Sequence, residues 1–191
     1  MIPFNHLGWI FKTFGAKIYP KVVQEELCTF IRPLSKGAKV LDVGGGTGMM
    51  NTFIYTCRKD LALTSVDPAK GMLKFSPSYI TSHQGTAEKL PFQDNEFELL
   101  LMGESLHHFR NVDEALSESV RVLKAKGKLF IYDFNLNTFM GKSIYRVEKF
   151  LGEPGNFFEP TSLKNKLETY GFTVQIKNYG WRYTLSAVLE I

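Results

Sequence analysis

The sequence predicts an α/β fold: a doubly wound, mostly parallel sheet with helices on both faces and a C-terminal antiparallel hairpin. Three observations predict it. Short apolar runs typical of buried parallel strands alternate with helical segments between residues 39 and 134. Glycines and acids follow these runs, at the edge where open α/β sheets bind ligands. Two further strand-like segments near the C-terminus are joined by a short turn, which suits an antiparallel pair.

The elements are predicted in a regular order. Apolar spacing indicates a first helix up to about residue 18, and Pro20 starts a second helix that Pro33 ends. Strands are predicted over residues 38–43, 61–67, 79–85, 97–103 and 128–134, with helices between them over 47–58, 68–75 and 112–127. Two more helices, over 138–150 and 161–170, precede the hairpin of residues 171–180 and 182–191.

Composition and charge fit one domain over residues 1–191. The chain is 44% hydrophobic and 22% charged, and its net charge of +4 suits anionic small molecules or membrane surfaces. Cys28 and Cys57 lack C-x-x-C spacing, so we expect no disulfide framework, no metal site and a cytoplasmic location. No apolar run approaches the roughly 20 residues that span a bilayer.

The run VLDVGGGTG ends the first predicted strand, and its glycines let a ligand approach the backbone closely. The dinucleotide pattern G-x-G-x-x-G does not close, because Met49 and Asn51 stand where its third glycine belongs. A P-loop lysine is also absent. Asp42 suits a cationic ligand better than a phosphate, and S-adenosylmethionine carries a sulfonium and an ammonium. Asp42 can attract its amino-acid end through water.

Asp67 ends the second predicted strand and can accept hydrogen bonds from both hydroxyls of a ribose. A purely structural role is also open, because an aspartate followed by Pro68 is typical of a helix start. The two roles are compatible.

With these motifs, the chain resembles the class I S-adenosylmethionine-dependent methyltransferases, most of all the group of ubiquinone and menaquinone biosynthesis methyltransferases. The resemblance covers about Lys39 to Phe134 and rests on VLDVGGGTG, VDPAKGML, GTAEKLPFQDNEFELLLMGESLHHF and EALSESVRVLKAKGKLFIYD. It implies a Rossmann-like, seven-stranded fold and S-adenosylmethionine as cofactor. At position 86 the chain has a threonine, where an aspartate is common in the family. The cofactor-binding candidates are Asp42, Gly44, Gly45, Gly46, Gly48, Asp67, Pro68, Met72, Thr86, Ala87, Glu88 and Gly103.

The segment GESLHHF lies where a methyl acceptor should bind. His107 and His108 are candidate general bases, and Glu104 is a third candidate or a residue that orients a histidine. The alternative is that His108 packs under the next helix, that Glu104 or Ser105 caps a turn, and that neither histidine touches the substrate. Weaker candidates at the end of the fifth strand are Tyr132, Asp133 and Asn135.

The expected acceptor is a small molecule, apolar or aromatic. Nucleic-acid amino methyltransferases of this fold carry a Pro-Pro motif after the fourth strand, which this chain lacks, so we expect no nucleic-acid partner. Residues 1–32 are expected to form a helical lid that closes over the acceptor, rests on a membrane interface or simply packs on the core. Residues 136–170 border the acceptor pocket or only connect elements.

Two other functions remain open. The chain could bind S-adenosylmethionine without transferring a methyl group, as a sensor or a partner subunit. A nicotinamide oxidoreductase is a third hypothesis, which the missing third glycine disfavours.

Overall fold

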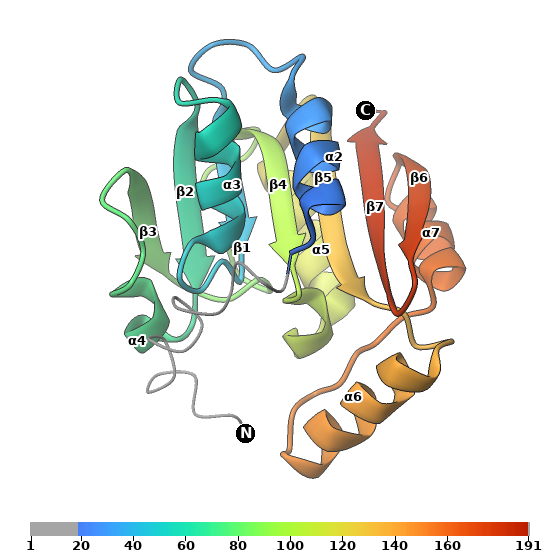
Figure 1. Ribbon diagram of the computed structural model, residues 1–191. Helices are drawn as coiled ribbons and strands as arrows, with labels where there is room; N and C mark the ends of the chain where they lie inside the picture. The colour runs from blue at the N-terminus through green and yellow to red at the C-terminus, as the bar shows by residue number, and fades with distance from the viewer. Residues whose placement is uncertain (1–18, 191) are drawn as a thin grey trace.

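A seven-stranded sheet organises residues 19–190, the part of the chain that the computed structural model describes. Its strand order is β3-β2-β1-β4-β5-β7-β6 (Figure 1). The parallel strands are β1 (Lys39–Val43), β2 (Ala62–Asp67), β3 (Ile80–Gln84), β4 (Phe97–Gly103) and β5 (Leu123–Phe134). The hairpin of β6 (Phe172–Tyr179) and β7 (Arg182–Leu189) joins through β7, which is antiparallel to β5. The predicted architecture is confirmed.

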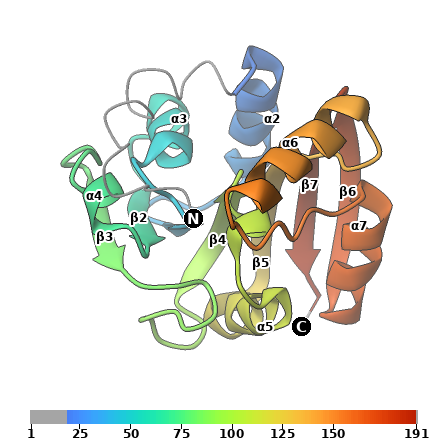
Figure 2. The same ribbon diagram turned by 90° about the horizontal axis from the view of Figure 1, so that it is seen from below.

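Helices cover both faces of the sheet, as Figures 1 and 2 show. On one face lie α2 (Lys21–Ile31) and α3 (Met49–Cys57), which pack on side chains such as Val40 and Leu99. On the other lie α5 (Val112–Val122) and α7 (Pro160–Thr169), packed on Leu41 and Leu100. Because successive strand residues face opposite sides, a strand buried on both faces needs an unbroken apolar run. None of the described helices has the length and apolar character to cross a bilayer.

The carboxyl ends of the strands carry short elements that frame the ligand edge. α4 (Lys70–Leu73) and α6 (Phe139–Phe150) lie beyond the strand ends (Figure 1), and the 3₁₀ helix η2 (Leu106–His108) follows β4. The strand order reverses between β1 and β4, which makes the gap above these two strands the expected ligand site of the fold.

The helix predicted over residues 112–127 is five residues too long. It begins as expected at Val112, after Asn111, whose side chain accepts the N–H groups of Asp113 and Glu114, but it ends at Val122. Leu123 is extended and pairs with Phe97, and the register then shifts so that Leu99 faces Lys128. The register shift places the irregular KAKG segment inside β5 rather than at the end of a helix.

The structure also corrects the expectation that the two cysteines are unpaired. Cys28 on α2 and Cys57 at the end of α3 are joined as a disulfide, with their Cα atoms 5.8 Å apart. That separation lies within the usual range for a disulfide, about 4.4–6.8 Å. The helix packing brings together residues whose spacing in the sequence indicates no pairing.

Candidate active site

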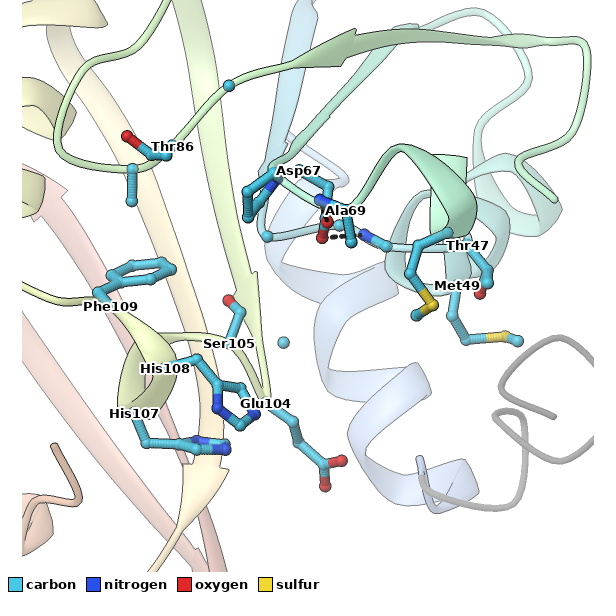
Figure 3. Close-up of a pocket in the computed structure, with 18 of the residues that line it drawn as sticks. Thr47, Met49, Asp67, Ala69, Thr86, Glu104, Ser105, His107, His108 and Phe109 are labelled. Carbon is cyan, nitrogen blue, oxygen red and sulfur yellow. Dashed lines mark hydrogen bonds between the residues drawn. The ribbon is translucent and has the colours of Figure 1, made fainter. Parts of the chain in front are cut away.

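A cavity of about 430 Å³ opens at the carboxyl ends of β1, β2 and β4 (Figure 3). This volume lies within the range of small-molecule pockets, roughly 300–1,000 Å³. Most of the predicted cofactor residues line the cavity, together with all three predicted catalytic residues. The predicted residues that line it are Gly44, Gly45, Gly46, Asp67, Pro68, Met72, Thr86, Ala87, Glu88, Gly103, Glu104, His107 and His108.

The glycine turn after β1 needs glycine for its backbone shape and for its close contacts. Gly44 and Gly46 have φ values of +71° and +53°, in the left-handed region that other residues avoid. A Cβ atom on Gly44 would lie 2.6 Å from the Cβ of Ser105, and one on Gly46 would lie 3.1 Å from the Cε of Met72. At the turn, backbone atoms without side chains therefore form the cavity wall.

Asp67 holds this turn in place from the end of β2. Its Oδ2 accepts the N–H of Gly46 at 3.0 Å and its Oδ1 accepts the N–H of Ala69 at 2.7 Å. Burial raises the pKa of Asp67, and the two backbone hydrogen bonds oppose that rise. Each carboxylate oxygen keeps a second lone pair, so the side chain can organise the turn and still accept a hydroxyl of a ligand.

Two predicted cofactor residues lie outside the cavity wall. The carboxylate of Asp42 sits under the turn, where a Cβ on Gly45 would come within 2.8 Å of its Cγ. Burial and the charge of Asp67 raise the pKa of Asp42 to about 7, and its Oδ2 is buried with no hydrogen-bond partner among the described residues. Gly48 faces Ile80 instead, and its φ of +79° starts α3.

The loop after β3 brings Thr86, Ala87 and Glu88 to the cavity. The Glu88 Oε1 accepts the backbone N–H groups of Arg110 at 2.7 Å and of Asn111 at 3.3 Å. Burial opposes ionisation of Glu88, but these hydrogen bonds outweigh it and lower the pKa. Glu88 thus ties this loop to the chain that follows η2.

His107 is buried between two carboxylates. Its Nδ1 lies 2.6 Å from Oδ1 of Asp133, and its Nε2 lies 3.6 Å from Oε1 of Glu148 on α6. Burial by itself would lower the pKa of His107, but the two carboxylates raise it to about 10. At neutral pH the ring is therefore an imidazolium, which cannot accept another proton.

His108 has the opposite character. Burial and the neighbouring charge of His107 lower its pKa, so its ring is neutral at neutral pH. Its Nδ1 lies 3.4 Å from Oε2 of Glu153. Glu104 has a left-handed backbone, with a φ of +51°, and its Oε1 lies 2.7 Å from the guanidinium of Arg182. Burial raises the pKa of Glu104 to about 8 although Arg182 opposes the rise.

Several site residues were missed or undervalued by sequence reasoning. Asp133, a weaker candidate by its position at a strand end, is only 3% exposed and binds His107. Glu148 belongs to the segment expected to border the acceptor pocket, and it lines the cavity. Arg182 comes from the terminal hairpin and carries no sequence signal for this role. Tyr19 also lines the cavity, while the other predicted lid residues before it lie outside the described part of the chain.

Among the described residues, His107, His108 and Glu148 place potential ligand atoms within 4.8 Å of one another, as a metal site would require. Asp133 and Glu148 already balance the charge of the His107 imidazolium. The expectation that the protein has no metal site stays a prediction.

Comparison with known proteins shows what the chain is similar to. Residues 41–131 match the family model of a methyltransferase domain. The ubiquinone/menaquinone biosynthesis C-methyltransferase of Psychromonas ingrahamii is 35% identical over 118 residues, which are 56% of this chain and 46% of the relative. The malonyl-[acyl-carrier protein] O-methyltransferase of Methylococcus capsulatus is 27% identical over 86% of this chain and 66% of its own. The chain spans about half the length of the ubiquinone/menaquinone relative.

Solved structures share the fold. A methyltransferase from Thermotoga maritima, described as a possible histamine N-methyltransferase, has a TM-score of 0.70 at 19% identity, covering 96% of this chain and 99% of its own. An S-adenosylmethionine-dependent methyltransferase from Aquifex aeolicus has a TM-score of 0.70 at 18% identity, covering 93% and 98%. Residues 41–131 are therefore similar to a methyltransferase domain, and the described residues share the fold of solved S-adenosylmethionine-dependent methyltransferases.

Proposed function

We propose that this chain transfers the methyl group of S-adenosylmethionine to a small-molecule acceptor that is apolar or aromatic. One observation carries the proposal: a single cavity joins the glycine turn and Asp67 to Glu104, His107 and His108. Methyl transfer requires a cofactor site beside the acceptor, and it requires a proton-accepting group where the acceptor must lose a proton. The names of the curated relatives support the same activity.

The residues present fit S-adenosylmethionine better than a dinucleotide. The left-handed glycines leave room for a ligand against the backbone, and Asp67 offers lone pairs to a ribose. Asp42 and Glu104 are buried acids whose raised pKa values fall when a cation binds nearby. A pyrophosphate at the same place would meet these carboxylates with a like charge.

When bound, S-adenosylmethionine supplies an electrophilic methyl group on its sulfonium. The protein has to hold the acceptor in line and, where the acceptor carries a proton, to remove it. His108 is suited to accept that proton because its ring is neutral. His107 is suited to a positioning role, since Asp133 and Glu148 hold it as a cation. Glu104 is a second acid–base group at the same wall.

Aromatic side chains form part of the cavity wall. Phe109 and Phe134 line it, and the ring of Phe134 stacks on Trp181 with centroids 5.7 Å apart and planes 8° apart. The ring of Phe157 stacks on His107 at 4.5 Å. Such walls favour an apolar or aromatic acceptor with one polar group near the histidines.

The test is turnover with S-adenosylmethionine that carries a labelled methyl group, against a panel of hydroxylated aromatics, quinols and amines. We expect labelled product with at least one acceptor class. His108→Gln should lower turnover by about 10²–10⁴-fold on an acceptor that must lose a proton, while affinity for S-adenosylhomocysteine is kept. The matched control is His83→Gln on the exposed strand β3.

Equal turnover of the two variants would remove His108 from the base role. Tight binding of S-adenosylhomocysteine without turnover of any acceptor would favour the hypothesis of a non-catalytic binding module.

A further inference from the structure

Helix α6 carries an exposed apolar surface beside the cavity. Among the described residues, eight large hydrophobic side chains are exposed, and five of these belong to α6 or to its C-terminal cap. Phe139 is 83% exposed and Phe150 is 89% exposed, and the other three are Met140, Val147 and Leu151. Isolated exposed hydrophobic residues are common on proteins, whereas a cluster on one helix indicates a binding surface.

The five side chains form an apolar stripe along one side of α6, in two groups. Successive helix residues are rotated by about 100°, so Phe139, Phe150 and Val147 fall within roughly 80° of one another. Met140 and Leu151 extend the same stripe to roughly 120°. One group, Phe139 and Met140, lies at the start of α6 and the other lies at its end, with Ser143 on the same side between them.

Basic residues border this stripe on one side. Lys142, Arg146 and Lys149 occupy an arc of roughly 60° next to Phe139. The one acidic residue of α6, Glu148, points the other way, toward His107 in the cavity. The outer surface of α6 thus combines apolar and positive side chains and carries no negative one.

The inner surface of α6 faces the site. Gly141 is buried, and the side chain of Glu148 is only 13% exposed. Figure 1 shows α6 below the lower ends of β5 and β7, where the parallel strands have their carboxyl ends. A partner bound to the outer surface would therefore sit beside the cavity and leave Glu148 in place.

We propose that the outer surface of α6 docks on an anionic lipid bilayer. A helix with a strong apolar stripe, low overall hydrophobicity and lysine and arginine on its polar side is typical of helices that lie in a membrane interface. The basic flank complements anionic lipid headgroups, and the net charge of +4 for the whole chain has the same sign. Trp181, which follows β6, is also exposed. It lies near the start of α6, because its carbonyl accepts the backbone N–H of Asn135.

Docking would explain how an apolar acceptor reaches the cavity, a link that rests on the proposed function. An acceptor dissolved in the bilayer would then meet the cavity without crossing water. The docking itself does not depend on methyl transfer, so it can be measured without cofactor or acceptor.

The experiment is flotation of the full chain with phosphatidylcholine vesicles, with and without phosphatidylserine. We expect binding to the anionic vesicles and much weaker binding to the neutral ones. Phe139→Gln with Phe150→Gln should lower the affinity at least tenfold. Replacing Lys142, Arg146 and Lys149 with glutamine should lower it roughly fivefold per charge on anionic vesicles.

Matched controls carry the same kinds of change elsewhere on the surface. Val22→Gln and Tyr79→Gln remove exposed hydrophobic side chains away from α6. Lys36→Gln, Lys89→Gln and Lys164→Gln remove three positive charges outside it. Thermal unfolding of each variant shows whether the fold is kept.

Absence of binding by the unmodified chain would overturn the proposal. Equal binding by the α6 variants and the controls would do the same. Sedimentation equilibrium tests another occupant: a dimer that the double phenylalanine variant dissociates, without vesicle binding, would assign the surface to a second copy of the chain.

Discussion

Asp67 is the side chain on which the cofactor site depends most, and Asp67→Asn is the sharpest test of that role. Asparagine has nearly the same shape but one acceptor oxygen, so it keeps one of the two backbone hydrogen bonds to Gly46 and Ala69. It also loses the negative charge that would hold a ribose hydroxyl. A hydrogen bond to a charged group contributes about 1.5–3 kcal/mol, so affinity for S-adenosylhomocysteine should fall by roughly 10- to 150-fold.

Asp67→Ala should have a second effect. It removes both acceptors and leaves the N–H groups of Gly46 and Ala69 without this partner at a buried place. Each unsatisfied buried group costs about 1–3 kcal/mol, so the free energy of unfolding should fall by about 2–4 kcal/mol once water partly compensates. Asp67→Ala should therefore lower the stability of the fold as well as the affinity for the cofactor.

The assay is calorimetric titration with S-adenosylhomocysteine, paired with urea unfolding. Asp94→Asn is a suitable control, because the side chain of Asp94 is 70% exposed. Wild-type affinity and stability in Asp67→Asn would refute both the ribose role and the turn role. A loss of stability without a loss of affinity would refute the ribose role alone.

Four further results are expected. Gly44→Ala should lower the free energy of unfolding by about 2–4 kcal/mol, because φ is +71° and the new Cβ meets a side-chain atom at 2.6 Å. The control Gly37→Ala, with open space around it, should lower it by about 1–2 kcal/mol. Equal losses of the two variants in urea unfolding would contradict this prediction. The affinity for S-adenosylmethionine, measured by calorimetry, should rise between pH 6 and pH 9. Asp42 and Glu104 ionise roughly in this range, and a cation binds better beside ionised acids. An affinity that does not change with pH would contradict this prediction. In NMR, the His107 ring should stay protonated at pH 8. The protonated ring should contribute its full stabilisation below about pH 6.5, and that contribution should be lost as the pH rises through about 10. Titration of the ring near pH 6.5 would show that the carboxylates do not hold its proton. Methyl transfer should persist in a chelator, and its loss would assign a metal to the histidine cluster.

The features of this protein that follow from local rules could be predicted from the sequence. The glycines of VLDVGGGTG indicate a left-handed turn, and Gly44 and Gly46 adopt it. Acids and glycines at strand ends meet at one edge because parallel strands end on the same side, and Asp67 and Gly103 both line the cavity. The central strands β1 and β4 were located correctly because their buried runs are mostly apolar, whereas β5 begins five residues before the predicted residue 128.

The features that depend on distant contacts could not be predicted. Arg182 reaches Glu104 because β7 pairs with β5, which places the hairpin turn beside the end of β4. Glu148 reaches His107 because α6 crosses the sheet edge. The charge states of the two histidines follow from these neighbours, and the residues of GESLHHF alone do not determine them.

Calorimetric titration of the purified chain with S-adenosylhomocysteine and NAD, side by side, tests directly which cofactor the cavity binds. The cavity that joins the glycine turn to Asp67 predicts saturable binding of S-adenosylhomocysteine and no heat with NAD. Binding of NAD without binding of S-adenosylhomocysteine, in a folded sample, would contradict the assignment of this cavity to methyl transfer.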